Sequence, residues 1–389
     1  MKKKISILGS TGSIGVTTLN ILNKKKNLFK INLLSADKNL NLICKQIKMY
    51  KPNFFIINNL KVFQKVITKI KKTKTQIILS NNFRYKSLTK SDITLSAIPG
   101  LDGLAPTIEM IKKSNKLLIA NKESIICGWD IIKKVSKKYS TKIIPIDSEH
   151  FSIMQLLSNY KLCDVKKIYL TASGGPFLDR SASSLKKIKP YEALRHPKWK
   201  MGKKITVNSS TLMNKILEII EAQKLFNIPS NKLDIVIHPE SLVHAIVELK
   251  NGLNKFIYHE TSMTIPIANA IFNNKVDIKN FLNLKTKKRI NNLSFRNVDS
   301  KIFPMIKLKE IVNEYYSTPI IINAANELLV DQFLRKKIPF LSMYKLVLIV
   351  LKDRNYKKYA IKKPKNIDQI IKISDWTKTV LMNKIKNYA

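Results

Sequence analysis

Residues 4–15 read KISILGSTGSIG, and this stretch decides the fold of the N-terminal part of the chain. The apolar run from Ile5 to Leu8 is typical of a buried strand, and the residues after Gly15 have the spacing of an amphipathic helix. Glycines at 9, 12 and 15 lie between the two elements. In this context backbone N–H groups and a helix N-terminus bind a dinucleotide pyrophosphate. We therefore predict a Rossmann-like dinucleotide site here.

Strand and helix patterns then alternate along the first 147 residues. We predict strands at 31–35, 54–57, 76–79, 93–98, 116–120 and 143–146, and helices at 40–50, 62–70 and 104–113. This alternation is typical of a parallel, doubly wound sheet. At the end of the second strand, Asp37 favours NAD, whereas Lys38 with Asn39 favours the 2′-phosphate of NADP. The balance indicates NADPH.

The charge is large but dispersed. Lys and Arg outnumber Asp and Glu by 71 to 26 among 389 residues, a net charge of +45. The lysines are spread from Lys2 to Lys386, and aromatic residues do not alternate with them in any repeating way. We therefore expect no nucleic-acid partner, although the charge could steer an anionic substrate. The three cysteines are isolated, and no signal peptide or long apolar segment is apparent, so we expect a cytoplasmic protein without a membrane segment.

Two carboxylates stand close together in the hexapeptide PIDSEH, residues 145–150. In an extended segment Asp147 and Glu149 would point to the same side and would need a cation or a shared proton. The alternative is a strand-to-helix turn, in which Asp147 or Ser148 caps a helix and Glu149 lies in its first turn. The hexapeptide leaves both interpretations open.

The segment from His150 to His259 contains all five histidines and is the expected chemical centre. The sequence TASGGP at 171–176 is typical of a strand that ends in an anion-binding loop. A helix is predicted to begin near Ser210 or Thr211, with small polar residues at its start that suit a phosphate. Glu218 and Glu221 would share one face of it. The alternative is an ordinary helix with a solvated acidic face.

Seven ordered motifs together resemble the 1-deoxy-D-xylulose 5-phosphate reductoisomerase family. They are GSTGSIG (9–15), ANKES (120–124), PIDSEH (145–150), SGGPF (173–177), RHPKWKMGKKITVNSSTLMNK (195–215), HPESLVH (238–244) and INAANE (322–327). The resemblance extends from Ile5 to about Glu327. It implies conversion of 1-deoxy-D-xylulose 5-phosphate to 2-C-methyl-D-erythritol 4-phosphate with NADPH and a divalent cation, in non-mevalonate isoprenoid synthesis.

The residue patterns and the resemblance together predict a fold of the α/β class in successive parts. An N-terminal Rossmann-like doubly wound parallel sheet would occupy residues 1–147, and a central α+β catalytic domain residues 148–273. A connection would follow at 274–300 and a C-terminal helical bundle at 301–389. The family further suggests a homodimer and a phosphosugar substrate.

Site residues follow from the resemblance, motif by motif. The implied ligands of Mg²⁺ or Mn²⁺, with Co²⁺ as a further candidate, are Asp147, Glu149 and Glu218; with Lys122 they form the implied catalytic set. Lys122 and Glu221 would lie near the reacting hydroxyls. The implied substrate contacts are Lys122, Ser148, Glu149, Ser173, His196, Ser209, Asn214, Lys215 and Glu218. The implied NADPH contacts are Thr11, Gly12, Ser13, Ile14, Lys38, Asn39, Asn121, Glu123 and Gly202.

A mobile flap is implied for His196, Trp199 and Met201. Ser241 is a further candidate for substrate contact, with the histidines beside it structural. Three positions depart from the family pattern: Asp37 replaces a small residue, Ile216 a glycine, and Asn208 a residue that is often aspartate.

Two other functions stay open from the residues alone. One is a simple NAD(P) dehydrogenase in which Cys127 or His150 does the chemistry. The other is a basic RNA-binding protein with a vestigial nucleotide fold.

Overall fold

The computed structural model describes residues 2–199, 201–282 and 292–386, which form two compact units. The first comprises Met1–Ser124, Asp130–Asp147 and Met263–Leu284, and the second comprises Ile125–Trp129, Ser148–Ser262 and Lys285–Ala389. Residues 283–291 of the connection predicted at 274–300 lie outside the described residues. The four-part domain boundaries expected from the sequence stay a prediction.

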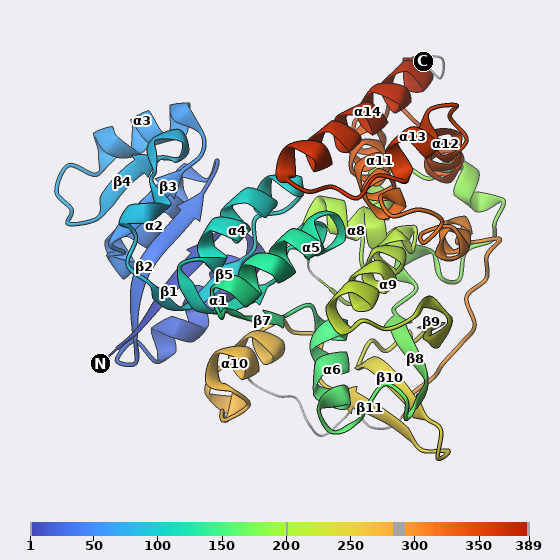
Figure 1. The fold of residues 1–389 in the computed structure, drawn as a ribbon, viewed down its shortest axis with the longest axis horizontal. Coiled ribbons are helices and arrows are strands. Elements are labelled where there is room, and N and C mark those ends of the chain that lie inside the picture. The colour runs from blue at the N-terminus through green and yellow to red at the C-terminus, as the bar shows by residue number, and fades with distance from the viewer. Residues whose placement is uncertain (1, 200, 283–291, 387–389) are drawn as a thin grey trace. The chain divides into compact units, whose positions relative to one another are not determined.

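The first unit is built on a parallel sheet, as predicted (Figure 1). In the described part of the chain it has seven strands in the order β4-β3-β2-β1-β5-β6-β7. Their bounds are Lys3–Leu8 (β1), Phe29–Ala36 (β2), Phe54–Ile57 (β3), Gln76–Leu79 (β4), Ser91–Ser96 (β5), Ser114–Ile119 (β6) and Lys142–Pro145 (β7). The strand order reverses between β1 and β5, which is the position where doubly wound sheets bind nucleotides.

Helices connect these strands and cover the sheet. They are Ser13–Lys24 (α1), Leu40–Tyr50 (α2), Leu60–Lys69 (α3), Leu104–Ile111 (α4) and Lys122–Lys138 (α5), with Thr264–Phe272 (α10) added from later in the chain. Phe272 packs edge-on against Phe29, with ring centroids 5.7 Å apart, so α10 belongs to this unit. The inner strands are almost fully buried at their centres, as the uninterrupted apolar runs predict, whereas the edge strand β4 is only partly buried.

The glycine turn after β1 has the close packing that its sequence requires. A Cβ on Gly9 would come within 2.6 Å of the Ala97 carbonyl oxygen, and one on Gly15 within 2.4 Å of the Gly9 carbonyl oxygen. Gly12 differs, because its Cβ would meet nothing closer than 3.5 Å. Packing within the chain therefore explains two of the three glycines, and close approach of a ligand would explain the third.

The second unit contains a mixed sheet in the order β11-β10-β8-β9. Its strands are Val165–Ala172 (β8), Leu233–Ile237 (β9), Val243–Leu249 (β10) and Asn254–Tyr258 (β11). β8 pairs parallel with β9 and antiparallel with β10, which confirms the α+β character expected for this region. Helices Ser148–Leu156 (α6), Pro190–Ala193 (α7), Lys203–Ser210 (α8) and Met213–Phe226 (α9) accompany the sheet.

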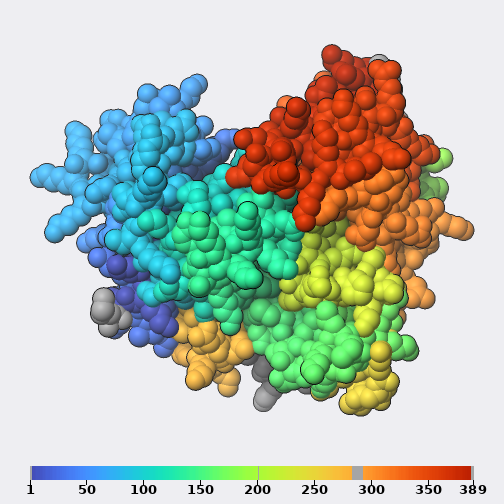
Figure 2. Space-filling model, in the orientation of Figure 1, coloured from blue at the N-terminus to red at the C-terminus, as the bar shows by residue number. Residues whose placement is uncertain are grey.

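The C-terminal part of the second unit is helical, as predicted. Its helices are Thr318–Leu334 (α11), Ser342–Leu351 (α12), Tyr356–Ala360 (α13) and Ile367–Ile385 (α14), and α14 forms part of the visible surface (red in Figure 2). α11 packs against α12 and α14. None of the helices in the described ranges is long and apolar enough to cross a membrane.

Candidate active site

Three carboxylates meet where β7 ends and α6 begins. Asp147 is the last residue of the first unit, one peptide bond before α6, and Glu149 lies in the first turn of that helix. Carboxylate oxygens of Asp147, Glu149 and Glu218, the last from α9, lie within 4.8 Å of one another. The strand-to-helix turn is therefore the correct local structure, and the extended segment is not. α9 packs against α6 and supplies Glu218, which brings the three carboxylates together.

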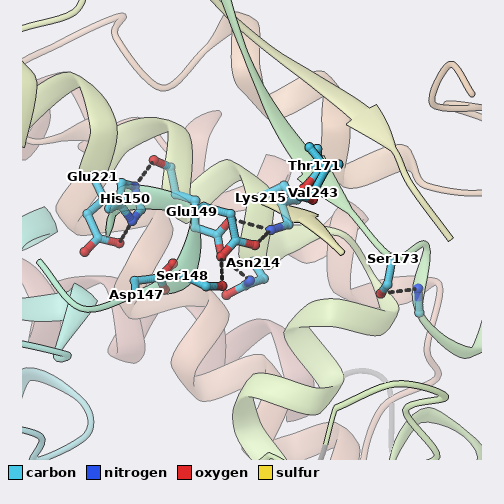
Figure 3. A network of polar contacts seen from close by, with 12 residues as sticks. Asp147, Ser148, Glu149, His150, Thr171, Ser173, Asn214, Lys215, Glu221 and Val243 are labelled. Atoms are coloured by element: carbon cyan, nitrogen blue, oxygen red, sulfur yellow. Dashed lines mark hydrogen bonds and ion pairs between the residues drawn. The ribbon is translucent and has the colours of Figure 1, made fainter. Parts of the chain in front are cut away.

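Lys215 of α9 joins two of these carboxylates (Figure 3). Its ammonium group donates to Glu149 Oε1 and, at 2.5 Å, to Glu218 Oε2. Burial lowers the pKa of Lys215, but the two carboxylates raise it by more, so that the net shift is upward. Lys215 is thus a buried ammonium ion that is paired on both sides.

The second oxygen of each glutamate is bonded as well. Ser148 Oγ donates to Glu149 Oε2 at 2.5 Å, and the Asn214 amide donates to Glu218 Oε1. Asn214 and Glu218 are four residues apart on α9, which places them on one face. Ser148, Asn214 and Lys215 are therefore brought together with the carboxylates, as the sequence predicts for residues of one site.

A buried histidine lies behind the carboxylates. His150 Nε2 is 2.9 Å from the backbone carbonyl oxygen of Glu218, and Nδ1 is 3.4 Å from Glu221 Oε2. Asp147, His150 and Glu221 form a second group whose ligand atoms lie within 4.8 Å. From the sequence, His150 was a candidate only as the catalyst of the alternative NAD(P) dehydrogenase. Its position beside Glu149 in the PIDSEH motif was the available signal.

Lys122 begins α5 and is paired with Asp147, its Nζ 3.1 Å from Asp147 Oδ2. The preceding residue, Asn121, caps α5: its Oδ1 accepts from Ser124 N, and its amide donates to the Gly100 carbonyl oxygen at 2.9 Å. The ANKES motif thus supplies both a lysine paired with Asp147 and the residue that caps α5. Cys127 is buried, and its Sγ accepts a hydrogen bond from Asn323.

Ser173 and His196 form the polar pair at the other end of the candidate site. Ser173 Oγ lies 3.0 Å from His196 Nε2 and accepts from Gly175 N at 3.1 Å. His196 Nδ1 accepts from the backbone N–H groups of Lys198 and Trp199. The hydrogen of neutral His196 is therefore on Nε2 and points to Ser173. This arrangement leaves the Ser173 hydroxyl hydrogen available to a ligand.

The charge state of His196 follows from its surroundings. Burial, and then the positive charge of Lys215, lower its pKa from 6.5 to about 4. His196 is consequently neutral at neutral pH, and it acts there as a hydrogen-bonding group rather than as a cation.

Ser209 lies in the last turn of α8, not at the start of the following helix. α8 ends at Ser210, Leu212 adopts a left-handed conformation with φ +58°, and α9 begins at Met213. The predicted helix is therefore present but begins two to three residues later than expected, and α8 before it was not predicted. Gly175, with φ +63°, packs against this turn, since a Cβ there would lie 3.1 Å from the Ser209 carbonyl oxygen.

The residues expected to contact the nucleotide lie in the first unit, except Gly202. Gly12 precedes α1, and Thr11, Ser13 and Ile14 are partly or fully exposed around it. Asn39 caps α2 by accepting from Leu42 N. Lys38 Nζ lies 3.8 Å from Asp37 Oδ2, and both side chains are exposed. The open face at Gly12 and the exposed Lys38 fit a dinucleotide with a 2′-phosphate.

The carboxylate cluster fits a divalent cation. Mg²⁺ and Mn²⁺ prefer oxygen ligands, and Asp147, Glu149 and Glu218 offer oxygens from one compact group. The neutral donors around them are a serine and an amide, which orient carboxylates without supplying softer ligands.

Comparison with family models gives three matches. A 1-deoxy-D-xylulose 5-phosphate reductoisomerase model matches residues 5–128. Two models of the C-terminal domains of the same family match residues 143–226 and 259–380.

Curated relatives and solved structures agree with these matches. 1-Deoxy-D-xylulose 5-phosphate reductoisomerase of Pelagibacter ubique is 44% identical over 96% of this chain and 97% of its own length. The enzyme of Thermodesulfovibrio yellowstonii is 36% identical over 98% and 99%. A structure of the reductoisomerase with NADPH, fosmidomycin and magnesium has a TM-score of 0.89 at 28% identity, covering 99% of this chain and 98% of that chain. The Zymomonas mobilis enzyme with NADPH has a TM-score of 0.87 at 27% identity, with 99% of both chains covered.

Proposed function

This chain belongs to the 1-deoxy-D-xylulose 5-phosphate reductoisomerase family, and from that premise we propose how its residues divide the family's reaction among them. The protein is an NADP-dependent oxidoreductase that rearranges and reduces 1-deoxy-D-xylulose 5-phosphate to 2-C-methyl-D-erythritol 4-phosphate, with a divalent cation, in non-mevalonate isoprenoid synthesis. The observation that carries the assignment of the site is the group of three carboxylates within 4.8 Å.

Asp147, Glu149 and Glu218 are the proposed cation ligands. When bound there, Mg²⁺ or Mn²⁺ supplies Lewis-acid polarisation of the substrate's carbonyl and hydroxyl oxygens. Ser148 is the proposed substrate contact beside the cation, and its hydrogen bond to Glu149 Oε2 supports a role in orienting that carboxylate. Lys122 holds Asp147 in position and brings a positive charge to the reacting hydroxyls.

Glu221 is the proposed partner of Lys122 at the reacting hydroxyls. It is 99% buried and lies against His150, so that its carboxylate has a defined position.

The proposed phosphate site combines hydroxyl and amide donors with the ammonium group of one lysine. It consists of Ser173, Ser209, Asn214 and Lys215, and His196 is bonded to Ser173 beside it. Because neutral His196 donates to Ser173 Oγ, the serine hydroxyl can donate its own hydrogen to a phosphate oxygen. Closure of the segment that carries His196, Trp199 and Met201 would exclude water during hydride transfer.

The glycine turn and its neighbours are the proposed NADPH site. Gly12 permits close approach of the pyrophosphate, and the start of α1 directs backbone N–H groups toward it. Lys38 is the proposed contact of the 2′-phosphate. Thr11, Ser13, Ile14, Asn39, Asn121, Glu123 and Gly202 complete the proposed set.

One assay tests this division of roles. Purified protein with 1-deoxy-D-xylulose 5-phosphate and NADPH should lose nicotinamide absorbance only when Mg²⁺ or Mn²⁺ is present. A chelator should stop turnover, and added cation should restore it. Turnover that a chelator does not reduce would remove the carboxylates from the cation role and would favour a simple dehydrogenase. Salt-sensitive RNA binding without turnover would favour the RNA-binding alternative.

We also propose a homodimer that works in the cytoplasm. β11 lies at the edge of its sheet, and Leu253 and Phe256 beside and within it are exposed at 55% and 47%. An exposed edge strand with apolar side chains suits pairing with a second copy. Light scattering should therefore give twice the mass of one chain.

A further inference from the structure

Lys215 makes the contacts that a cation between Glu149 and Glu218 would need. Its ammonium group donates to one oxygen of each carboxylate, at 2.5 Å in the case of Glu218. Mg²⁺ binds carboxylate oxygens at about 2.1 Å. A cation and this ammonium group cannot both approach the same two oxygens so closely.

The other donors to these carboxylates are neutral and are compatible with a bound cation. The remaining oxygen of Glu149 accepts from Ser148, and that of Glu218 accepts from Asn214. Each carboxylate oxygen has a second lone pair, so a cation can bind both glutamates while Ser148 and Asn214 stay in place. Among Ser148, Asn214 and Lys215, the lysine alone is charged and alone contacts both, so repulsion by a divalent cation acts most strongly on it.

Ser173 and His196, which belong to the proposed phosphate-binding region, lie within the electrostatic reach of Lys215. Its charge is one of the two causes that lower the pKa of His196, and His196 is bonded to Ser173. In the view of Figure 3, Lys215 is drawn between Glu149 and Ser173. The flexible stem of lysine allows its ammonium group to turn from one position to the other while α9 stays in place.

We propose that Lys215 and the divalent cation compete for Glu149 and Glu218, and that the displaced ammonium group binds the phosphate of the substrate. This inference rests on the proposed function, which assigns the glutamates to the cation and Ser173 to the phosphate. Because coupling between two ligands is reciprocal, cation and phosphate should each strengthen the binding of the other through Lys215.

The test is Mn²⁺ binding to the full chain, measured by calorimetry and by the electron paramagnetic resonance signal of unbound Mn²⁺. Inorganic phosphate serves as the second ligand, at concentrations that keep manganese phosphate in solution. In the wild type, phosphate should tighten Mn²⁺ binding about tenfold. In Lys215→Met, Mn²⁺ should bind about tenfold more tightly than in the wild type without phosphate, and phosphate should have almost no further effect.

Two variants serve as controls. Lys224→Met removes the same charge from the last turn of the same helix, and it should behave as the wild type in both measurements. Lys215→Arg keeps the charge and should keep the weak, phosphate-dependent binding of Mn²⁺. Should Lys215→Met fail to fold without a cation, Lys215→Gln gives the same comparison, since its amide can still donate to the carboxylates.

The outcomes separate this inference from the proposed function. If Lys215→Met binds Mn²⁺ as the wild type does or more weakly, the competition is wrong while the cation site stands. If the wild type binds no Mn²⁺ with or without phosphate, the cation site itself is wrong, and the competition falls with it. If Lys215→Met binds Mn²⁺ more tightly and phosphate no longer affects that binding, both the competition and the cation site are supported.

Discussion

His150 Nε2 lies 2.9 Å from the backbone carbonyl oxygen of Glu218. Because a carbonyl oxygen only accepts hydrogen bonds, Nε2 carries the hydrogen and donates it. The ring is fully buried, and the contact joins the first turn of α6, which carries Glu149, to the turn of α9 that carries Glu218. His150 is therefore placed to hold the two carboxylates at a fixed separation.

His150→Ala should weaken Mn²⁺ binding about 10- to 100-fold, as is usual when a residue that orients metal ligands is lost. His150→Gln retains a donor for the Glu218 carbonyl and should recover part of the affinity. Calorimetric titration with Mn²⁺ checks both, and NADPH affinity should stay unchanged as a control. Wild-type Mn²⁺ affinity in His150→Ala would show that the helices hold the carboxylates without this contact.

Glu149→Gln should lower kcat about a thousandfold, or about 4 kcal/mol, because one anionic cation ligand is lost. The substitution preserves the size of the side chain and lies outside the first unit, which contains the glycine turn. NADPH binding, followed by nicotinamide fluorescence, should therefore be nearly intact. Equal losses of turnover and of NADPH binding would contradict this division of labour between residues.

Sequence periodicity predicted the first unit well because its strands are buried and each is followed by a helix. The bounds predicted for α2, β3 and β4 are those observed. The short helix α8 was missed, because its sequence KKITVNSS contains β-branched and small polar residues and lacks an apolar repeat. The break at Leu212 was missed for a related reason: leucine rarely adopts positive φ, so no local signal marks it.

The candidate site was predictable where a motif places several of its residues close together in the chain. PIDSEH and the segment that leads into α9 identified the carboxylates, and of the two local structures that the hexapeptide left open, the strand-to-helix turn is the one observed. The contact of Lys215 with Glu149 spans 66 positions of the sequence and depends on how α6 meets α9. No local sequence pattern marks a contact between segments so far apart in the chain. The contact of His150 with the Glu218 carbonyl could not be predicted for the same reason.

His196 should titrate near pH 4, well below an ordinary histidine, because burial and Lys215 disfavour its charged form. In the unfolded chain its pKa is about 6.5. Between these values the unfolded chain binds more protons, so the contribution of His196 to stability is fully present above about pH 6.5 and is lost as the pH falls toward 4. Proton NMR of the His196 ring, identified by comparison with His196→Gln, should give the midpoint. A midpoint near 6.5 would contradict the buried, neutral imidazole.

Asp37→Ser should lower the KM for NADPH about threefold, the size expected for one exposed charge pair. Asp37 lies beside Lys38, so its carboxylate both attracts that lysine and repels the 2′-phosphate assigned to it. NADH lacks this phosphate and serves as the internal control, with an unchanged KM. A similar fall for both nucleotides, or for neither, would separate Asp37 from recognition of the 2′-phosphate.

Replacing Ser241 by alanine should make the protein more stable and weaken its binding of substrate. It is 93% buried with φ +57°, and within the described residues its Oγ has no hydrogen-bond partner. Burying such a hydroxyl costs about 1–3 kcal/mol. If the group is kept for substrate, Ser241→Ala should raise the free energy of unfolding by about 1 kcal/mol and should raise the KM for 1-deoxy-D-xylulose 5-phosphate about fivefold.

Ser152→Ala is the matched control for this substitution. Ser152 of α6 is also buried, and its Oγ likewise has no partner among the residues described. It has no assigned contact with substrate, so its replacement should stabilise the fold while leaving KM unchanged. Denaturant unfolding and steady-state kinetics on the two variants separate the effects. If Ser241→Ala stabilised the protein without changing KM, as Ser152→Ala is expected to do, the Ser241 hydroxyl would have no role in substrate binding.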